Sequence, residues 1–141
     1  MTVETYAPKR VEVIVAGVPI RGFADGTFIT AERTREAFAT NVGADGEASR
    51  TASSDRTGKV TITLQQTSDS NDFLSGLALA DEVSLNGQFP FLLKDTNGRT
   101  LIEAPCAWID KIANSEFSNE LTDREWIISL GEMIPFVGGN N

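Results

Sequence analysis

Strict alternation of apolar and polar residues is the feature that most constrains how this chain folds. A period of two suits a strand with one buried face and does not suit a helix. The clearest run covers residues 60–64, where Val, Ile and Leu alternate with threonines. Residues 11–15 form a second run, in which valines occupy every other position and Gly17 follows. β-Branched residues dominate both runs, so we predict two half-buried strands.

The second half of the chain carries further strand signals. An Asn-Gly step within residues 95–98 is a strong hairpin-turn signal, and apolar runs at 89–93 and 100–104 flank it. Two more apolar stretches, at 107–113 and 124–130, also favour strands. We therefore predict a hairpin followed by two additional strands.

Residues 22–42 and the last five residues give weaker signals of structure. A glycine-bounded turn at 22–26 precedes strand-forming residues at 27–30, and residues 36–42 resemble a partner strand. The simplest interpretation is an early antiparallel meander. Residues 137–141 read Val-Gly-Gly-Asn-Asn, and we predict that this tail is flexible.

One short helix is indicated after the alternating run at 60–64. Ser68 or Ser70 can cap its free backbone amides, and Asp72 suits the positive end of the helix dipole. The apolar residues that follow recur at helical spacing and define one stripe: Phe73, Leu74, Leu77 and Ala78. We expect Phe73, Leu74 and Leu77 to pack this helix against the sheet.

Strands outnumber the one helix, so the predicted class is mainly β, an antiparallel sandwich or small barrel with the helix on one face. The length of 141 residues suits one domain spanning residues 1–141. No apolar run approaches the roughly 20 residues that span a bilayer, so we expect no membrane association. Residues 1–10 lack the pattern of a secretory signal, which places synthesis and function in a cytoplasm.

Residues 43–57 are polar and small and show no periodicity, so we predict a long extended loop. Such loops are uncommon in compact domains and are usually functional or disordered. The segment has too little apolar surface to offset its ordering cost, roughly 1–2 kcal/mol per residue for the backbone. We therefore expect contacts from outside the subunit to order it.

The residue inventory argues against an enzyme. Histidine is absent, which excludes Ser-His and Cys-His nucleophile pairs and every His-containing metal site. Cys106, the one cysteine, has no electropositive neighbours and suits a small buried hydrophobe. We predict no catalytic residue, no metal site and no cofactor.

Several weaker motifs have ordinary explanations. Acidic pairs occur at Asp45 and Glu47, Asp69 and Asp72, and Asp81 and Glu82, all in polar turns or helix ends where solvated carboxylates are common. The 95–98 segment resembles the start of a calcium loop but lacks flanking helices, and we interpret it as a hairpin turn. Residues 43–46 suggest a phosphate cradle, yet no Gly-Lys-Ser/Thr follows.

Two tryptophans keep a non-structural alternative open. Trp108 and Trp126 could form a platform for a sugar ring, which would make the chain a monomeric β-sandwich that binds a carbohydrate or protein ligand. Each tryptophan lies in an apolar run, however, where a core or subunit-interface role is favoured. The net charge of -8 repels phosphate and argues against DNA binding by charge attraction.

Considered together, residues 42–50 and 55–72 resemble a known family. With the Phe-Pro-Phe-Leu-Leu-Lys-Asp run at 89–95 and Ala-Trp-Ile-Asp at 107–110, they are similar to tail-tube subunits of contractile-tailed bacteriophages. The likeness runs through most of the chain. Related tubes occur in type VI secretion and in tailocins, and phage is the nearest setting.

The resemblance implies a structural role. Strands would join those of five neighbours in a hexameric ring with a continuous β-barrel lumen, and stacked rings would form the inner tail tube for DNA ejection. The 43–57 loop would reach a neighbouring subunit or ring, and its charged residues could pair there: Asp45, Glu47, Arg50, Asp55 and Arg56.

The resemblance also implies partners and a location. Besides copies of itself, the chain would meet tail sheath, baseplate and tail-terminator proteins. The tape-measure protein and phage DNA would pass through the lumen without specific binding, helped by the acidic charge balance. Assembly would occur in the host bacterial cytoplasm, and the product would lie in the virion tail.

Overall fold

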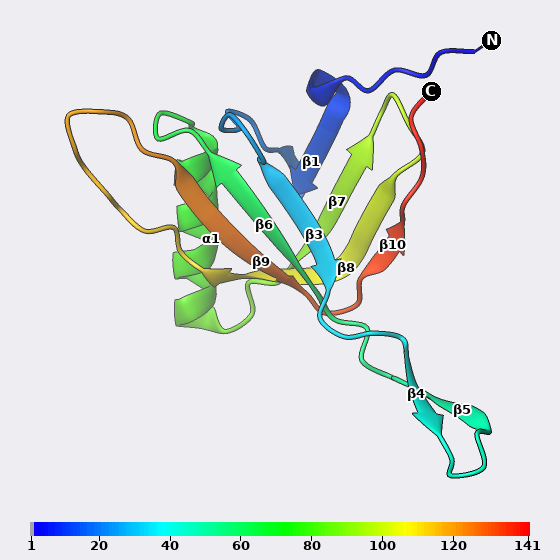
Figure 1. Cartoon of the computed structure of the whole chain (residues 1–141). Helices are drawn as coiled ribbons and strands as arrows, with labels where there is room; N and C mark the ends of the chain where they lie inside the picture. The colour runs from blue at the N-terminus through cyan, green and yellow to red at the C-terminus, as the bar shows by residue number, and fades with distance from the viewer. Residues whose placement is uncertain (1) are drawn as a thin grey trace.

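A computed structural model describes residues 2–141 (Figure 1). Helical structure in this part of the chain comprises the short 3-10 turn η1 (Pro8–Arg10) and the helix α1 (Ser70–Ser84). The strands, in chain order, are β1 (Val11–Val15), β2 (Val18–Pro19), β3 (Ile29–Arg33), β4 (Phe38–Val42), β5 (Ala48–Ala52), β6 (Gly58–Leu64), β7 (Phe89–Asp95), β8 (Leu101–Lys111), β9 (Arg124–Leu130) and β10 (Ile134–Phe136). The fold is mainly β with one α-helix, as predicted.

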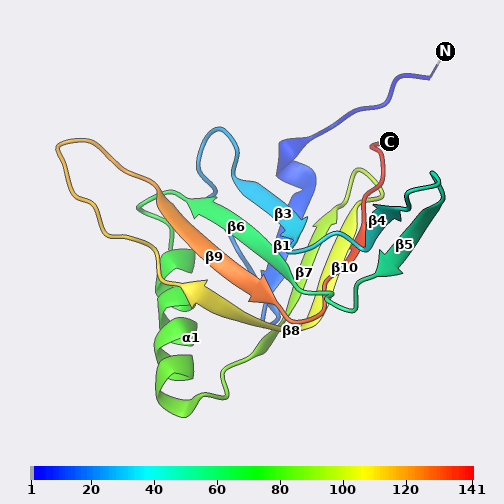
Figure 2. The same cartoon turned by 60° about the horizontal axis from the view of Figure 1, so that its bottom comes forward.

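Eight of the strands form one antiparallel sheet. Its order is β2-β1-β7-β8-β9-β6-β3, and β10 pairs with β8 beside this path. The remaining two strands, β4 and β5, pair only with each other and project from the body as a hairpin (Figures 1 and 2). We predicted a sandwich or barrel, and the structure corrects this to a single bent sheet.

The sheet bends along β8, its longest strand. The first part of β8 pairs with β7 and β10, while the part from Ala107 onward pairs with β9. Register shifts occur on both sides, between Phe89 and Phe91 and between Ile109 and Lys111. The bend divides the sheet into two halves, named here the β1–β7 half (β2, β1, β7, the first part of β8, and β10) and the β6–β9 half (the second part of β8, β9, β6 and β3).

The hydrophobic core lies between these halves. Alternate residues of β6 and β9 point inward and are buried, and β1 and β7 contribute from the other half. This confirms the strands predicted at 11–15, 60–64, 89–93 and 124–130. Helix α1 packs against β8, with Leu74 buried in the core and Phe73 and Leu77 packed against it.

The predicted early meander is wrong. Strand β3 pairs with β6, and β4 pairs with β5, so the 27–30 and 36–42 segments are not partners. The pairing follows from burial, because Ile29 and Ala31 pack against the core beside β6 whereas every residue of β4 is exposed. The β4–β5 hairpin is inserted between β3 and β6.

Two further boundaries differ from prediction. The 43–57 segment is not all loop, since residues 48–52 form β5; none of them is buried, so no alternation marked the strand. The strands predicted at 100–104 and 107–113 are one continuous strand, β8, which tolerates Pro105 at an exposed position.

The C-terminal tail makes backbone hydrogen bonds with the turn after β7, and its flexibility stays a prediction. The Arg99 amide donates to the Gly139 carbonyl at 2.9 Å, and the Asn141 amide donates to the Asn97 carbonyl at 3.0 Å. Strand β10, which we did not predict, precedes this tail. Within residues 2–141, no helix combines the length and hydrophobicity needed to cross a membrane.

Candidate assembly surfaces

The tryptophans do not form a shared platform. Trp126 is buried in the core, and its indole N–H donates to Asn71 Oδ1 at 2.9 Å, whereas Trp108 is half-buried on β8. A sugar platform needs exposed ring faces, so the carbohydrate-binding alternative loses the observation that favoured it.

The acidic pairs occupy structural positions. Asp69 and Asp72 lie at the start of α1, where Asp69 is the N-terminal cap residue without a side-chain cap bond. Ser68 Oγ accepts the Ser70 amide at 3.2 Å, and Asp81 Oδ1 accepts the Gly87 amide at 2.8 Å. Among residues 2–141, no group of three or more His, Cys, Asp or Glu side chains is placed to hold a metal.

The 95–98 turn is a hairpin turn, as predicted. Asp95 Oδ1 accepts the Asn97 amide at 3.0 Å, and the other carboxylate oxygen accepts from the Asn140 side-chain amide. Both oxygens thus serve the turn and the C-terminal tail.

The most unusual surface is the projecting hairpin, named here the arm (residues 34–57). All ten residues of its two strands are exposed. An isolated two-stranded hairpin is marginally stable in water. The two strands of the arm therefore contribute little stability to the subunit.

The arm has one apolar and cationic face. Cross-strand register places Phe38 opposite Ala52, Thr40 opposite Arg50, and Val42 opposite Ala48 on the same side. Phe38 and Val42 are 46% and 67% exposed, and the Arg50 guanidinium lies 4.0 Å above the Phe38 ring. This cation–π contact holds the Arg50 side chain against the Phe38 ring.

The root of the arm is built around Asp55. Its carboxylate pairs with Arg35 Nε at 3.2 Å and accepts the Thr57 hydroxyl at 2.6 Å and the Thr57 amide at 3.0 Å. The Thr57 hydrogen bonds, helped by the Arg35 charge, lower the pKa of Asp55. The Met133 amide donates to the Arg56 carbonyl at 2.8 Å, which ties the root to the body.

The five charged residues predicted for the interface are spread along the arm. Asp45 and Glu47 lie in the tip turn, Arg50 lies on β5, and Asp55 and Arg56 lie at the root. They do not converge on one site. The prediction missed Phe38 and Val42, although their spacing of four residues within the predicted 36–42 strand places both on one face.

The β6–β9 half has two open edges. Strand β3 pairs with β6 on one side only, and beyond Ala107 the side of β8 away from β9 has no strand partner among the described residues. A groove of about 380 Å³ runs beside that part of β8, lined by Ala78 and Asp81 of α1, by Leu85 just after it, and by Trp108 and Ile112.

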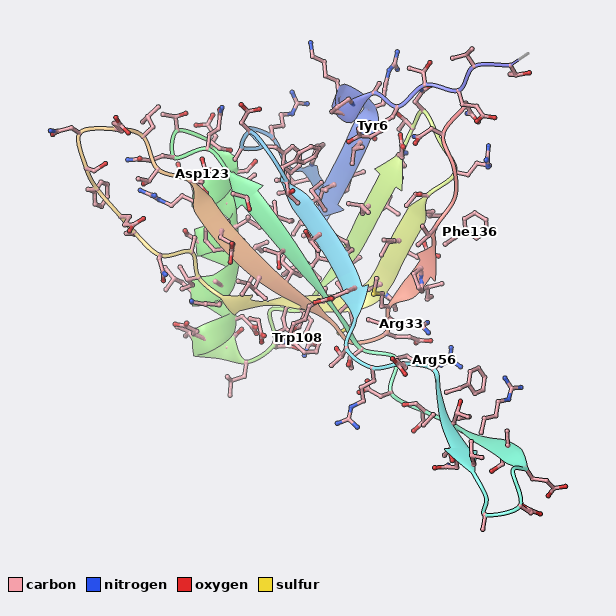
Figure 3. All side chains as sticks on the ribbon, in the orientation of Figure 1. Tyr6, Arg33, Arg56, Trp108, Asp123 and Phe136 are labelled. Carbon is pink, nitrogen blue, oxygen red and sulfur yellow. The ribbon has the colours of Figure 1, made fainter. Side chains whose placement is uncertain are left out.

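The two outer faces of the bent sheet differ in chemistry. The β6–β9 half presents mostly hydroxyl and charged side chains: Thr30, Glu32, Lys59, Thr61, Thr63, Glu125, Ile127 and Ser129. The β1–β7 half presents mostly apolar ones: Ile14, Pro90, Leu92, Leu101, Pro105, Ile134 and Phe136, with Glu12, Lys94 and Glu103 among them. Figure 3 shows Phe136 on this apolar side.

Open sheet edges and a projecting arm are features of this small β fold that a structural subunit would use in assembly. Comparison with known proteins identifies the chain as a structural protein and assigns it to a family. Residues 18–134 match the family described as Bacteriophage PhiTE tail tube protein, and the chain belongs to this family. It is a phage tail-tube structural protein and not an enzyme.

Relatives agree with this assignment. The chain is 34% identical to "Structural protein ORF10" of Pseudomonas phage KPP10 over 144 residues, covering 96% of this chain and 83% of that protein. A phage tail structural protein is a component of the virion tail.

Solved structures show the same fold in contractile injection systems. The sheath/tube terminator of the extracellular system PVC is 12% identical with a TM-score of 0.64, covering 97% of this chain and 100% of that one. A chain of the PVC sheath-tube complex is 11% identical with a TM-score of 0.63, covering 94% of this chain and 91% of that one. The cap that terminates the tube of the anti-feeding prophage is 11% identical with a TM-score of 0.62. The match covers 96% of this chain and 93% of that one.

Proposed function

We propose that copies of this chain form hexameric rings that stack into the inner tail tube through which phage DNA is ejected. The observation that carries the proposal is the β6–β9 half, whose two edge strands, β3 and the second part of β8, are open. An open edge offers unpaired backbone donors and acceptors to another strand. Family membership supports the same reading.

Strand direction favours ring closure through these edges. The order β8-β9-β6-β3 is antiparallel throughout, so β3 and β8 run in opposite directions. When β3 of one copy pairs with β8 of the next, the antiparallel alternation continues without interruption. A head-to-tail contact of this kind closes into a ring when its rotation permits.

The groove beside β8 supports the same contact. Leu85, which follows α1, and Ile112, which follows β8, are exposed and line this groove. Exposed apolar groups gathered next to an open strand edge are typical of an interface. We assign the groove to the neighbour that supplies β3.

The polar outer face of the β6–β9 half is the surface we assign to the lumen. Its charged groups include Glu32 and Glu125, and Lys59, whose ammonium is 3.5 Å from Asp110. A face rich in hydroxyls and carboxylates, whose lysine is neutralised, gives DNA no basic track to adhere to. The lumen is then neutral or acidic.

The remaining surfaces are assigned to the other partners. The apolar outer face of the β1–β7 half lies on the outside of such a ring, where the tail sheath surrounds the tube. Ring ends meet further rings, the baseplate or the tail terminator, and the tape-measure protein and DNA occupy the lumen. Assembly takes place in the host bacterial cytoplasm, and residues 1–141 act as one tail-tube domain.

Blocking the β3 edge tests ring closure. The Thr34 amide donates to the Thr57 carbonyl at 3.0 Å, and the Phe28 carbonyl accepts from the Thr63 amide at 2.9 Å, so by strand alternation the Ala31 amide points to the open side. Ala31→Pro removes this donor at an edge position where proline is tolerated. We expect a folded monomer by circular dichroism and light scattering, and rings or tubes from Ala31→Val, which keeps the amide. Rings from Ala31→Pro contradict the proposed edge contact.

A further inference from the structure

The loop between β8 and β9, residues 112–123, is braced from within by Arg124. This side chain is only 8% exposed, and its guanidinium donates to Thr122 Oγ1 at 2.7 Å and to the Glu116 carbonyl at 3.0 Å. Thr122 Oγ1 also donates to the Glu116 carbonyl at 2.8 Å, and the Thr122 amide donates to Gln66 Oε1 at 3.0 Å. These bonds hold Glu116 beside Thr122 and fix the second half of the loop.

The braced loop presents an apolar and acidic surface. Phe117 and Leu121 are 80% and 74% exposed, and the Arg124 guanidinium lies 5.5 Å from the centre of the Phe117 ring. The loop carries Glu116, Glu120 and Asp123 and contains no Lys or Arg. Large apolar side chains held outward on an ordered loop cost little entropy when they bind, which is typical of a docking surface.

This surface is complementary to the arm. The two strands of the arm present Phe38, Val42 and Arg50 on one face, and the acidic residues of the arm lie outside these strands: Glu36, Asp45, Glu47 and Asp55, the last paired with Arg35. The loop thus combines apolar groups with carboxylates, and this face of the arm combines apolar groups with the Arg50 guanidinium. Opposite charge on two surfaces of one chain steers copies into a single relative orientation.

The two surfaces lie at opposite ends of the β6–β9 half. The arm begins where β3 ends and returns where β6 begins, whereas the loop joins the start of β9, which pairs with the end of β6. Figure 3 shows Arg33 and Arg56 at the arm root and Asp123 at the far end of β9. Within one copy they cannot meet, so contact requires a second copy.

We propose that the arm of each copy docks on the 112–123 loop of a copy in the next ring. The proposal rests on the tube assembly proposed above and names the receptor for the arm. Because the two surfaces differ, the contact is head-to-tail and repeats without limit, which gives a polar stack of rings. The neighbour's Arg50 faces Glu116 and Glu120, and its Phe38 and Val42 contact Phe117 and Leu121.

A charge-swap cycle on the full-length chain tests the pairing. Arg50→Glu and Glu120→Arg change exposed residues, so both variants should fold like the wild type by circular dichroism. We expect each to form rings while tube mass in a pelleting assay falls at least about tenfold, since a small loss per contact multiplies around a ring. The Arg50→Glu, Glu120→Arg double variant should regain tubes in negative-stain images.

Each other outcome has a defined meaning. Normal tubes from both single variants, or a double variant that stays as rings, overturn the arm–loop contact. Loss of rings as well as tubes overturns its placement between rings. Failure of the wild type itself to form rings or tubes rejects the proposed function instead, so the two failures are distinguishable.

Discussion

At the scale of single residues, the organisation of this chain depends on side chains that satisfy backbone groups at the two ends of the strands. Arg124 holds the 112–123 loop by donating to its carbonyls, and Asp55 holds the arm root by accepting from Thr57 and Arg35. Neither has a catalytic partner nearby in the described structure. Their role is to fix the shape of surfaces that lie beyond the core.

Replacing Asp55 should loosen the arm while leaving the core intact. In Asp55→Ala the Thr57 amide and hydroxyl and Arg35 lose their acceptor, so amides of residues 34–57 should exchange with solvent about two- to tenfold faster. Hydrogen exchange with mass spectrometry measures this, and peptides from β6 and β9 serve as the internal control. Unchanged exchange across the arm would show that Asp55 does not organise its root.

The lowered pKa of Asp55 fixes the sign of the pH effect. The folded state favours the ionised carboxylate, so its stabilisation of the root is present above the ordinary pKa of 3.8. It is lost as the pH falls below that value through the lowered folded pKa. In acid, arm exchange in the wild type should therefore approach that of Asp55→Ala, after correction for the intrinsic exchange rate.

At the scale of elements, the arm is the part that separates this fold from a simple bent sheet. It is inserted between β3 and β6, which pair across it, and its strands touch no core residue. Under the proposed assembly, this exposed hairpin contacts another copy.

Replacing residues 43–57 by a short Gly-Ser linker should abolish tubes and spare the fold. The deletion removes β5 and the root carboxylate. In the main sheet, β1 still pairs with β7, and β6 still pairs with β9. We expect a native-like circular dichroism spectrum and no tubes by microscopy. Normal tubes from this variant would show that the arm is not an assembly element.

Buried alternation explains which elements were predictable. Strands β1, β6, β7 and β9 each have one face in the core, so hydrophobic spacing revealed them, and the apolar stripe revealed α1. Strand β5 is exposed on both faces and β10 has only three residues, so neither has a periodic signal. The β3–β6 pairing is set by packing between segments that the arm separates in sequence.

The assembly surfaces could be predicted only in part, because exposed residues leave no periodic pattern in the sequence. The polar composition of 43–57 marked a segment outside the core, which agrees with the exposure of every residue of β5. Phe38 and Val42 lay in a run assigned to the sheet, and the Arg124 brace depends on contacts between residues 66, 116, 122 and 124. Such contacts leave no local pattern.

At the scale of the whole molecule, two halves of one sheet enclose a core and turn chemically different faces outward. The hydroxyl- and carboxylate-rich face belongs to the half with open edges, and the apolar face belongs to the half with β10. A ring closed through the open edges therefore places its polar face on one side of the wall and its apolar face on the other. This arrangement suits a tube that guides a polyanion inside and meets protein outside.

Cryo-electron microscopy of the assembled wild-type protein tests this account most directly. We predict a six-fold tube in which β3 of each subunit pairs with β8 of the next and the β6–β9 half lines a neutral or acidic lumen. A protein that stays monomeric at every concentration and salt condition would contradict the account. A tube whose lumen is lined mainly by Lys and Arg would contradict the proposed route for DNA.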